Sequence, residues 1–263
     1  MMRATVLSVE APSIAAEVPE REYRRLLGLP RRFEPTGDLF EHAQRARAWY
    51  ADRGRPFLAA RRVELSACST RRVVLATGDV LESEVLAGRL RAGGAHALVV
   101  MAASAGHEAA AEAARSWNDG RPDEGFFLDR FAAAIAEALL RHATATIRAE
   151  FLQPGERLLA HCSPGCGKWP LDGQSRLATL LGANGSTVVG GFAPEPGEMS
   201  LGPVTLLASG ALRPQHSMLA ALGVTRRIVR RQSASPCRRC DLERCRYRRV
   251  PHCTDQPLTR EAP

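Results

Sequence analysis

Two stretches of the chain concentrate residue types that can do chemistry. The first, residues 161–174, reads HCSPGCGKWPLDGQ and places a histidine and two cysteines around a Ser-Pro-Gly turn. The second, residues 237–253, reads CRRCDLERCRYRRVPHC and carries four cysteines among arginines. Cysteine and histidine bind metals or do redox chemistry, and a Pro-Gly turn lets the backbone approach a small ligand closely. The first stretch could thus be a metal-binding site, a redox-active cysteine pair, a loop that binds a small ligand through its backbone, or only a turn.

The spacing within the first stretch favours the last two of these interpretations. His161 and Cys162 are neighbours on an expected strand, so their side chains point to opposite faces and do not chelate one metal together. Three residues separate Cys162 from Cys166, whereas thioredoxin-type redox pairs are separated by two. A turn that leads from a strand into a helix can bring backbone N–H groups up to a ligand. The positive start of the helix then favours a negatively charged ligand.

The second stretch has the composition of a metal site. Its cysteines follow the order C-x2-C-x4-C-x7-C, which makes Cys237, Cys240, Cys245 and Cys253 the expected ligands. In a reducing compartment, clustered thiols of this kind indicate metal binding more than disulfides. The spacing matches neither the usual ferredoxin run nor a standard zinc finger. An iron–sulfur cluster, a zinc ion and no metal at all therefore remain open.

Composition limits the class of protein. The 263 residues are 45% hydrophobic, which is enough to form a core and argues against global disorder. The net charge of +8 would suit an anionic partner, but a nucleic-acid binder should interleave aromatics with its basic residues. The arginine-rich tail offers only Tyr247, which disfavours nucleic acid. No apolar run is long enough for a signal peptide or a membrane span, so we expect a cytoplasmic protein without a membrane partner.

Helices and strands around the two stretches follow from hydrophobic periodicity and from Gly and Pro stop signals. The pattern predicts a mixed α+β domain over residues 1–224 and a small Arg/Cys-rich tail with the metal site over residues 225–263. Helices are expected at residues 17–28, 38–53, 79–94, 104–117, 126–147 and 171–181, and strands at 56–65, 71–78, 95–103, 156–162, 186–192 and 199–210.

The first stretch also resembles a known family. SPGCGKWPLDGQSRLATLLG, from Ser163 to Gly182, is similar to the Ser-Pro-Gly-Tyr-Gly segment found in relatives of the activation domain of cobalamin-dependent methionine synthase. Four other segments of this chain also resemble segments of the family, and they occur in the same order as in the family. They are EYRRLLGL, RRVVLATGDVLESEV, ALVVMAASAGHEAAAEAA and MSLGPVTLLASGALRPQHSMLAALGV. The resemblance covers roughly residues 17–247. It implies an α+β fold with a mixed, mainly antiparallel sheet and flanking helices.

The resemblance implies a function carried out on a partner. The family's domain binds S-adenosylmethionine and caps cobalamin that has been oxidised to cob(II)alamin, and an electron and a methyl group then restore methylcobalamin. This chain has no room for the homocysteine, folate and cobalamin modules of a complete methyltransferase. Cobalamin would therefore come only through a partner, either a corrinoid protein or a methionine synthase that lacks its own activation domain. A flavodoxin-like or ferredoxin-like protein would donate the electron.

The ligand-binding residues implied by the resemblance are His161, Ser163, Pro164, Gly165 and Cys166. Pro164 and Gly165 match the family, but Cys166 stands where the family has tyrosine and His161 where it has arginine. Arginine grips a carboxylate with two hydrogen bonds, whereas neutral histidine donates one. We therefore expect S-adenosylmethionine to bind weakly. A binding fold repurposed for another ligand, and a basic nucleic-acid-binding protein stapled by a metal, are the alternatives.

The tail has a family parallel of its own. Stand-alone relatives of the activation domain end in a similar C-x2-C-x4-C-x-Tyr-Arg signature, which here corresponds to Cys237, Cys240, Cys245, Tyr247 and Arg248. The resemblance thus supports three of the four cysteines, and proximity alone adds the fourth.

Overall fold

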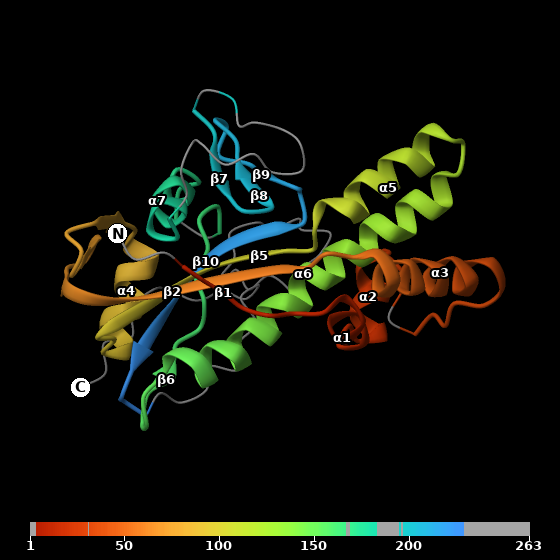
Figure 1. The fold of residues 1–263 in the computed structure, drawn as a ribbon. Helices are drawn as coiled ribbons and strands as arrows, with labels where there is room; N and C mark the ends of the chain where they lie inside the picture. The colour runs from red at the N-terminus through yellow and green to blue at the C-terminus, as the bar shows by residue number, and fades with distance from the viewer. Residues whose placement is uncertain (1–3, 31, 167–168, 183–194, 196, 229–263) are drawn as a thin grey trace, which may run out of the picture.

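The computed structural model describes the chain except for residues 1–3, 31, 167–168, 183–194, 196 and 229–263 (Figure 1). Cys237, Cys240, Cys245 and Cys253, the expected metal ligands, lie outside the described residues. So does almost all of the tail that we expect to begin at residue 225.

A seven-stranded sheet forms the centre of the fold, with the order β4-β3-β2-β5-β10-β6 and with β1 beside β2. Every described pairing in it is antiparallel, which confirms the expected α+β class with a mainly antiparallel sheet. The strands are β1 (Thr5–Val6), β2 (Phe57–Cys68), β3 (Arg72–Leu75), β4 (Val80–Glu82), β5 (Ala97–Ser104), β6 (Arg157–Leu158) and β10 (Ser217–Thr225).

Strand β5 is the middle of this sheet, and all eight of its residues are buried. Successive side chains of a strand point to opposite faces, so β5 contributes to two cores. Val99 and Met101 pack into the core on one face, whereas Leu98 and Val100 pack into the core on the other. The continuous apolar run that predicted a strand here is explained by burial on both faces.

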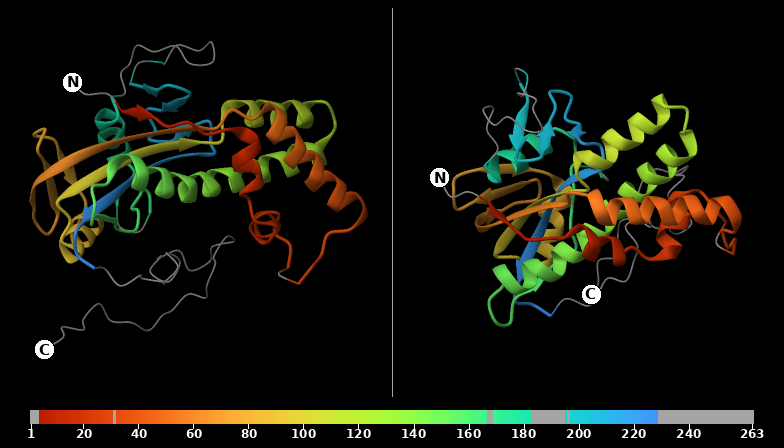
Figure 2. Two further views of the ribbon diagram at one scale, coloured as in Figure 1. Left: turned by 60° about the horizontal axis from the view of Figure 1, so that its bottom comes forward. Right: turned by 45° about the vertical axis from the view of Figure 1, so that its right-hand side comes forward.

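One face of the sheet is covered by α1 (Ala11–Ala16), α2 (Glu20–Leu26), α3 (Gly37–Arg53), α5 (His107–Asn118) and α6 (Pro122–Phe151). Figures 1 and 2 show α6 running along the sheet and continuing beyond it, where α3 and α5 pack against its first half. The expected stripe of α6 is buried, with Phe131, Ile135 and Leu139 fully covered. The helix begins earlier than expected because Pro122 occupies its first turn, beside Asp123 and Glu124, which suit the positive helix start, and it also ends later, at Phe151.

The opposite face is covered by α4 (Glu84–Gly93), α7 (Gly173–Leu180) and a second sheet of β7 (Met199–Leu201), β8 (Val204–Leu206) and β9 (Leu212–Arg213) (Figure 2). The expected helix over residues 79–94 begins only at Glu84. The hydroxyl of Ser83 accepts a hydrogen bond from the Leu86 amide and caps the helix there, and Gly94 ends it with a left-handed φ of 59°. The residues before the cap form β4 instead.

Other differences also have local causes. The expected helix over residues 17–28 is α2, which begins only at Glu20, after Pro19 at its N-cap, and α1 just before it lies outside the expected range. The strand expected over residues 156–162 is limited to β6 and a single bridge at Cys162. Among the described residues, no helix is long and apolar enough to cross a membrane.

Candidate ligand-binding site

The Ser-Pro-Gly segment forms a tight turn. The Cys166 amide donates to the Ser163 carbonyl over 3.1 Å, and Gly165 has a φ of +81°. Proline followed by a residue with positive φ is the pattern of a type II turn, which explains why glycine is needed at residue 165. The Gly165 amide donates to the Trp169 carbonyl over 2.8 Å. Both amides of the turn thus have acceptors within the protein, so neither is available to an anion.

Trp169 anchors the turn on the molecule. It is only 2% exposed and belongs to the core beneath α7. The first turn of α7 lies against its indole, since a Cβ added to Gly173 would come within 2.4 Å of the Trp169 Nε1. Helix α7 starts at Gly173, eight residues after Gly165, so its N-terminus does not directly follow the turn. The expected strand–turn–helix motif is therefore looser than its sequence indicates.

The chain that leads into the turn is held from two sides. Cys162 forms a two-way backbone bridge with Ala221 of β10, with both N–O distances at 2.8 Å. From α4, the guanidinium of Arg89 donates to the carbonyls of Ala160 and His161. On the far side, Arg61 of β2 donates to the Leu180 carbonyl at the end of α7 over 2.7 Å. Hydrogen bonds from β10, α4 and β2 therefore fix the chain on both sides of the turn.

Two polar atoms beside the turn are unsatisfied. The Ser163 hydroxyl oxygen and the Gln174 amide oxygen are both buried and have no hydrogen-bond partner in the part of the chain that the structure describes. A buried polar atom without a partner costs about 1–3 kcal/mol, so each of these atoms is suited to a ligand or an ordered water. Ser163 is one of the expected ligand-binding residues, whereas Gln174 is not among them.

The two cysteines of this stretch lie in different environments. Cys162 is buried, whereas Cys166 is exposed. Burial raises the pKa of the Cys162 thiol and the nearby Cys166 adds to the rise, although Arg89 acts in the opposite direction. A raised pKa reduces the thiolate fraction that redox chemistry needs. No group of three or more His, Cys, Asp or Glu side chains that could hold a metal is found among the described residues.

A buried ionic cluster fixes β6 just before the turn, and sequence reasoning missed it. The carboxylate of Glu156, whose side chain is 1% exposed, accepts hydrogen bonds from Arg62 at 2.6 and 3.0 Å, from the His96 Nε2 at 2.7 Å and from the Gln153 amide at 2.8 Å. The hydrogen bonds from Arg62 hold the pKa of Glu156 at about 2, against the effect of burial.

Comparison with known proteins places this geometry in a known fold. No protein-family model matches the chain, and no curated protein matches it. Among solved structures, it is similar to the MetH reactivation domain bound to AdoHcy, with a TM-score of 0.61 and 13% identity. The match covers 84% of this chain and 78% of that one. This chain has the fold of the MetH reactivation domain.

The reactivation-domain fold confirms the architecture that the sequence resemblance implied. At 13% identity it concerns the fold alone, and the ligand set His161, Ser163, Pro164, Gly165 and Cys166 remains a prediction. His161 is partly exposed, Pro164 is buried, and Gly165 and Cys166 are exposed. Among these residues, only Ser163 has a buried side-chain atom without a hydrogen-bond partner in the described structure.

Proposed function

We propose that this chain is an accessory protein that serves the reductive reactivation of a corrinoid partner, with S-adenosylmethionine as its ligand. The partner would be a corrinoid protein or a methionine synthase that lacks its own activation domain. The likeness to the MetH reactivation domain, a structure that holds AdoHcy, is the observation that carries the proposal. The Ser-Pro-Gly turn with its unsatisfied Ser163 hydroxyl supports a polar ligand at this place.

In this proposal the ligand lies against residues 161–166. The partly exposed His161 would donate one hydrogen bond to the ligand, and the Ser163 hydroxyl would satisfy a second polar group. Gly165 lets the backbone take its positive φ and leaves the turn open on the side where a larger residue would meet Leu171. S-adenosylmethionine, when bound, supplies the methyl group. The single histidine donor and the absence of a tyrosine ring at Cys166 make binding weak.

The tail extends the proposal to electron supply. Cys237, Cys240, Cys245 and Cys253 would bind a metal, either an iron–sulfur cluster that passes an electron or a zinc ion that stabilises the tail. The arginines around them would attract an acidic donor protein of flavodoxin or ferredoxin type. This part rests on cysteine spacing, because the tail lies outside the described residues. Iron, sulfide and zinc analysis of protein purified without oxygen, with its visible spectrum, tests it.

Two glycines allow a matched test of the ligand site. Gly165 and Gly155 have φ angles of +81° and +82°, so an alanine at either place carries similar backbone strain, about 1–2 kcal/mol. Only at Gly165 does the added Cβ meet a neighbour, the Leu171 Cδ1 at 3.1 Å, whereas Gly155 has nothing within 4 Å. Gly165→Ala should therefore weaken S-adenosylmethionine binding about tenfold in calorimetry, and Gly155→Ala should leave it unchanged.

Activity is measured with a cob(II)alamin-loaded methionine synthase that lacks its activation domain, S-adenosylmethionine and a chemical reductant. Formation of methylcobalamin should depend on this protein and should fall with Gly165→Ala. Equal binding by both glycine variants would show that the ligand does not contact the turn. Absence of any S-adenosylmethionine binding, together with no methylcobalamin formed, would overturn the function itself.

A further inference from the structure

Leu171 is an exposed leucine beside the Ser-Pro-Gly turn, and it lies between two glycines. It is 42% exposed. A Cβ added to Gly165 of the turn would come within 3.1 Å of the Leu171 Cδ1, and one added to Gly210 would come within 3.3 Å of its Cγ and Cδ2. Gly210 is in the connection between β8 and β9, in the small sheet that packs beside α7 (Figures 1 and 2). Since neither glycine has a side chain, Leu171 is flanked on both sides by backbone alone.

The chain on both sides of Leu171 is fixed, so its side chain is held at the surface. Trp169, two residues before it, is buried in the core, and Gly173, two residues after it, lies against the Trp169 indole. The Leu171 carbonyl accepts a hydrogen bond from the Gln174 amide over 3.0 Å. Turning Leu171 inwards would therefore pull Trp169 out of the core. An exposed leucine gives up hydrophobic stabilisation, which a ligand that covers it recovers.

The surface around Leu171 offers apolar contact and no spare N–H group from its two glycines. The Gly165 amide donates to the Trp169 carbonyl over 2.8 Å. The Gly210 amide donates to the Leu207 carbonyl over 2.9 Å. A flat group can lie against the Leu171 methyls and the backbone of both glycines. Such a surface favours an uncharged ring over a charged group, which would lose its hydration there without gaining a partner.

In the proposed function, on which this site depends, S-adenosylmethionine lies against residues 161–166 with its carboxylate at His161. This ligand is charged at its amino-acid end and at its sulfonium, whereas its adenine ring is flat and uncharged. We propose that the adenine ring lies on Leu171, between Gly165 and Gly210. The ligand then extends from His161 across the turn to Leu171. Leu171 would thus determine specificity for the nucleoside half of the ligand, and His161 for its amino-acid half.

The methyl groups of Leu171 give a direct test, because an aromatic ring shifts the NMR signals of methyl groups beneath it. In a ¹H–¹³C methyl spectrum, S-adenosylmethionine should shift the Leu171 signals saturably. Methylthioadenosine, which keeps the adenosine half and lacks the amino acid, should shift them in the same direction, and methionine should leave them in place. Leu171→Ala identifies the signals. Leu39, which is 39% exposed on α3, is the matched reference whose signals should not move.

Two substitutions separate apolar contact from the shape of the side chain. Leu171→Asn keeps the shape and makes it polar, so the affinity for S-adenosylmethionine and for methylthioadenosine should fall about five- to tenfold in calorimetry. Leu171→Met keeps the apolar contact and should retain both affinities within about twofold. Leu39→Asn is the matched control and should leave both unchanged. Thermal unfolding checks that each variant is folded.

The outcomes distinguish this site from the function on which it depends. Failure of the natural protein to bind S-adenosylmethionine would overturn the proposed function and the adenine site together. Saturable binding that leaves the Leu171 methyl signals in place, or equal affinity in Leu171→Asn, would overturn the adenine site alone. A shift of these signals by methionine as large as that by methylthioadenosine would overturn it as well, because the amino-acid half would then lie on Leu171.

Discussion

Replacement of Glu156 by glutamine tests whether the buried ionic cluster holds the chain that leads into the Ser-Pro-Gly turn. The substitution keeps the size of the side chain but removes its charge, which leaves Arg62 without its strongest partner. Removal of one partner from a buried ion pair costs about 3–5 kcal/mol of unfolding free energy. Because Arg62 and His96 keep 20% and 37% side-chain exposure, water reaches them, and we expect a loss of about 2–3 kcal/mol.

Glu64 provides the control for this variant. It also pairs with Arg62, at 2.8 Å, but its side chain is 53% exposed. Glu64→Gln therefore breaks a solvated ion pair, which costs about 0–1 kcal/mol. Urea unfolding at neutral pH measures both variants against the natural protein. A loss for Glu156→Gln that does not exceed the loss for Glu64→Gln would refute the idea that burial makes Glu156 the critical partner.

Acid provides a second readout of the same cluster. Folding lowers the pKa of Glu156 from its ordinary 4.5 to about 2, so the unfolded chain takes up the proton first as the pH falls. The stabilisation is complete above about pH 4.5 and is lost between there and about pH 2. The natural protein should therefore approach the stability of Glu156→Gln across this window. Asp129, with a pKa of about 2 in the folded protein, titrates in both proteins and cancels from the comparison.

The double change His161→Arg with Cys166→Tyr should strengthen S-adenosylmethionine binding about tenfold or more, because a bidentate charged pair contributes about 1.5–3 kcal/mol. Unchanged affinity in calorimetry would mean that the ligand binds other residues. Gly173→Ala should destabilise the fold by about 1–3 kcal/mol, since its Cβ would meet the Trp169 indole at 2.4 Å, and thermal unfolding without a shift would contradict this contact. Cys240→Ser should release the metal of the tail while the main domain stays folded, which metal analysis and circular dichroism check; unchanged metal content would count against that ligand.

Much of the fold could be predicted because the hydrophobic pattern of single segments indicated their secondary structure. The apolar run of β5 and the helical stripe of α6 each reflect burial that depends on hydrophobic pattern alone. The strand Ser217–Thr225 is not among the expected strands, since SMLAALGVT has neither an alternating pattern nor strong β-branched content. The short helix α1 (Ala11–Ala16) was missed, although Pro12 in its first turn is a residue that favours a helix start.

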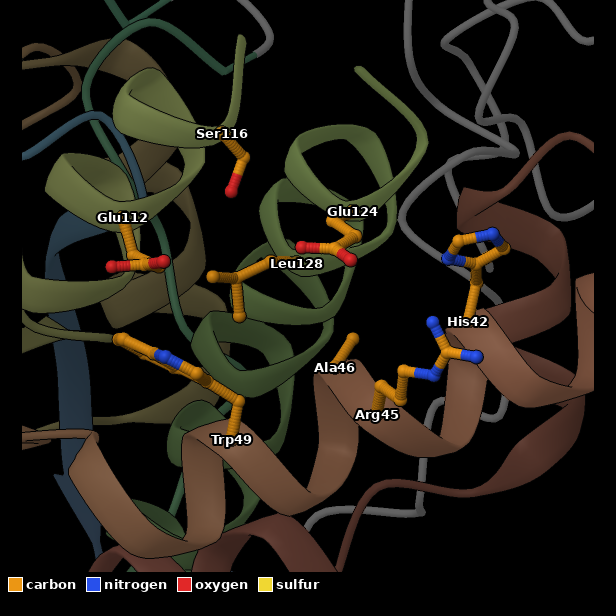
Figure 3. A pocket seen from close by; sticks show the side chains of 8 residues that line it. All are labelled: His42, Arg45, Ala46, Trp49, Glu112, Ser116, Glu124 and Leu128. Carbon is orange, nitrogen blue, oxygen red and sulfur yellow. The ribbon is translucent and has the colours of Figure 1, made fainter. Parts of the chain in front are cut away.

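The candidate sites were predictable to a lesser degree. The turn at Pro164 and Gly165 follows from the intrinsic conformations of these residues, and the structure has it. That its Gly165 amide is used by the Trp169 carbonyl depends on how the chain folds back, which no local pattern records. A pocket between α3, α5 and α6 combines residues from three helices (Figure 3). Its one sequence signal is the spacing of His42, Ala46 and Trp49, with the smallest residue in the middle.

The central strand β5 has a consequence for how ligand binding is observed. Each of its eight residues pairs with β2 on one side and with β10 on the other, and none is exposed. Its amides should therefore exchange their hydrogens with solvent only when the whole domain unfolds. A ligand that binds the folded chain raises the free energy of that unfolding by RT ln(1 + [L]/Kd), whichever face it occupies. Deuterium uptake by β5 thus reports S-adenosylmethionine at the turn as a change in the free energy of unfolding of the whole domain.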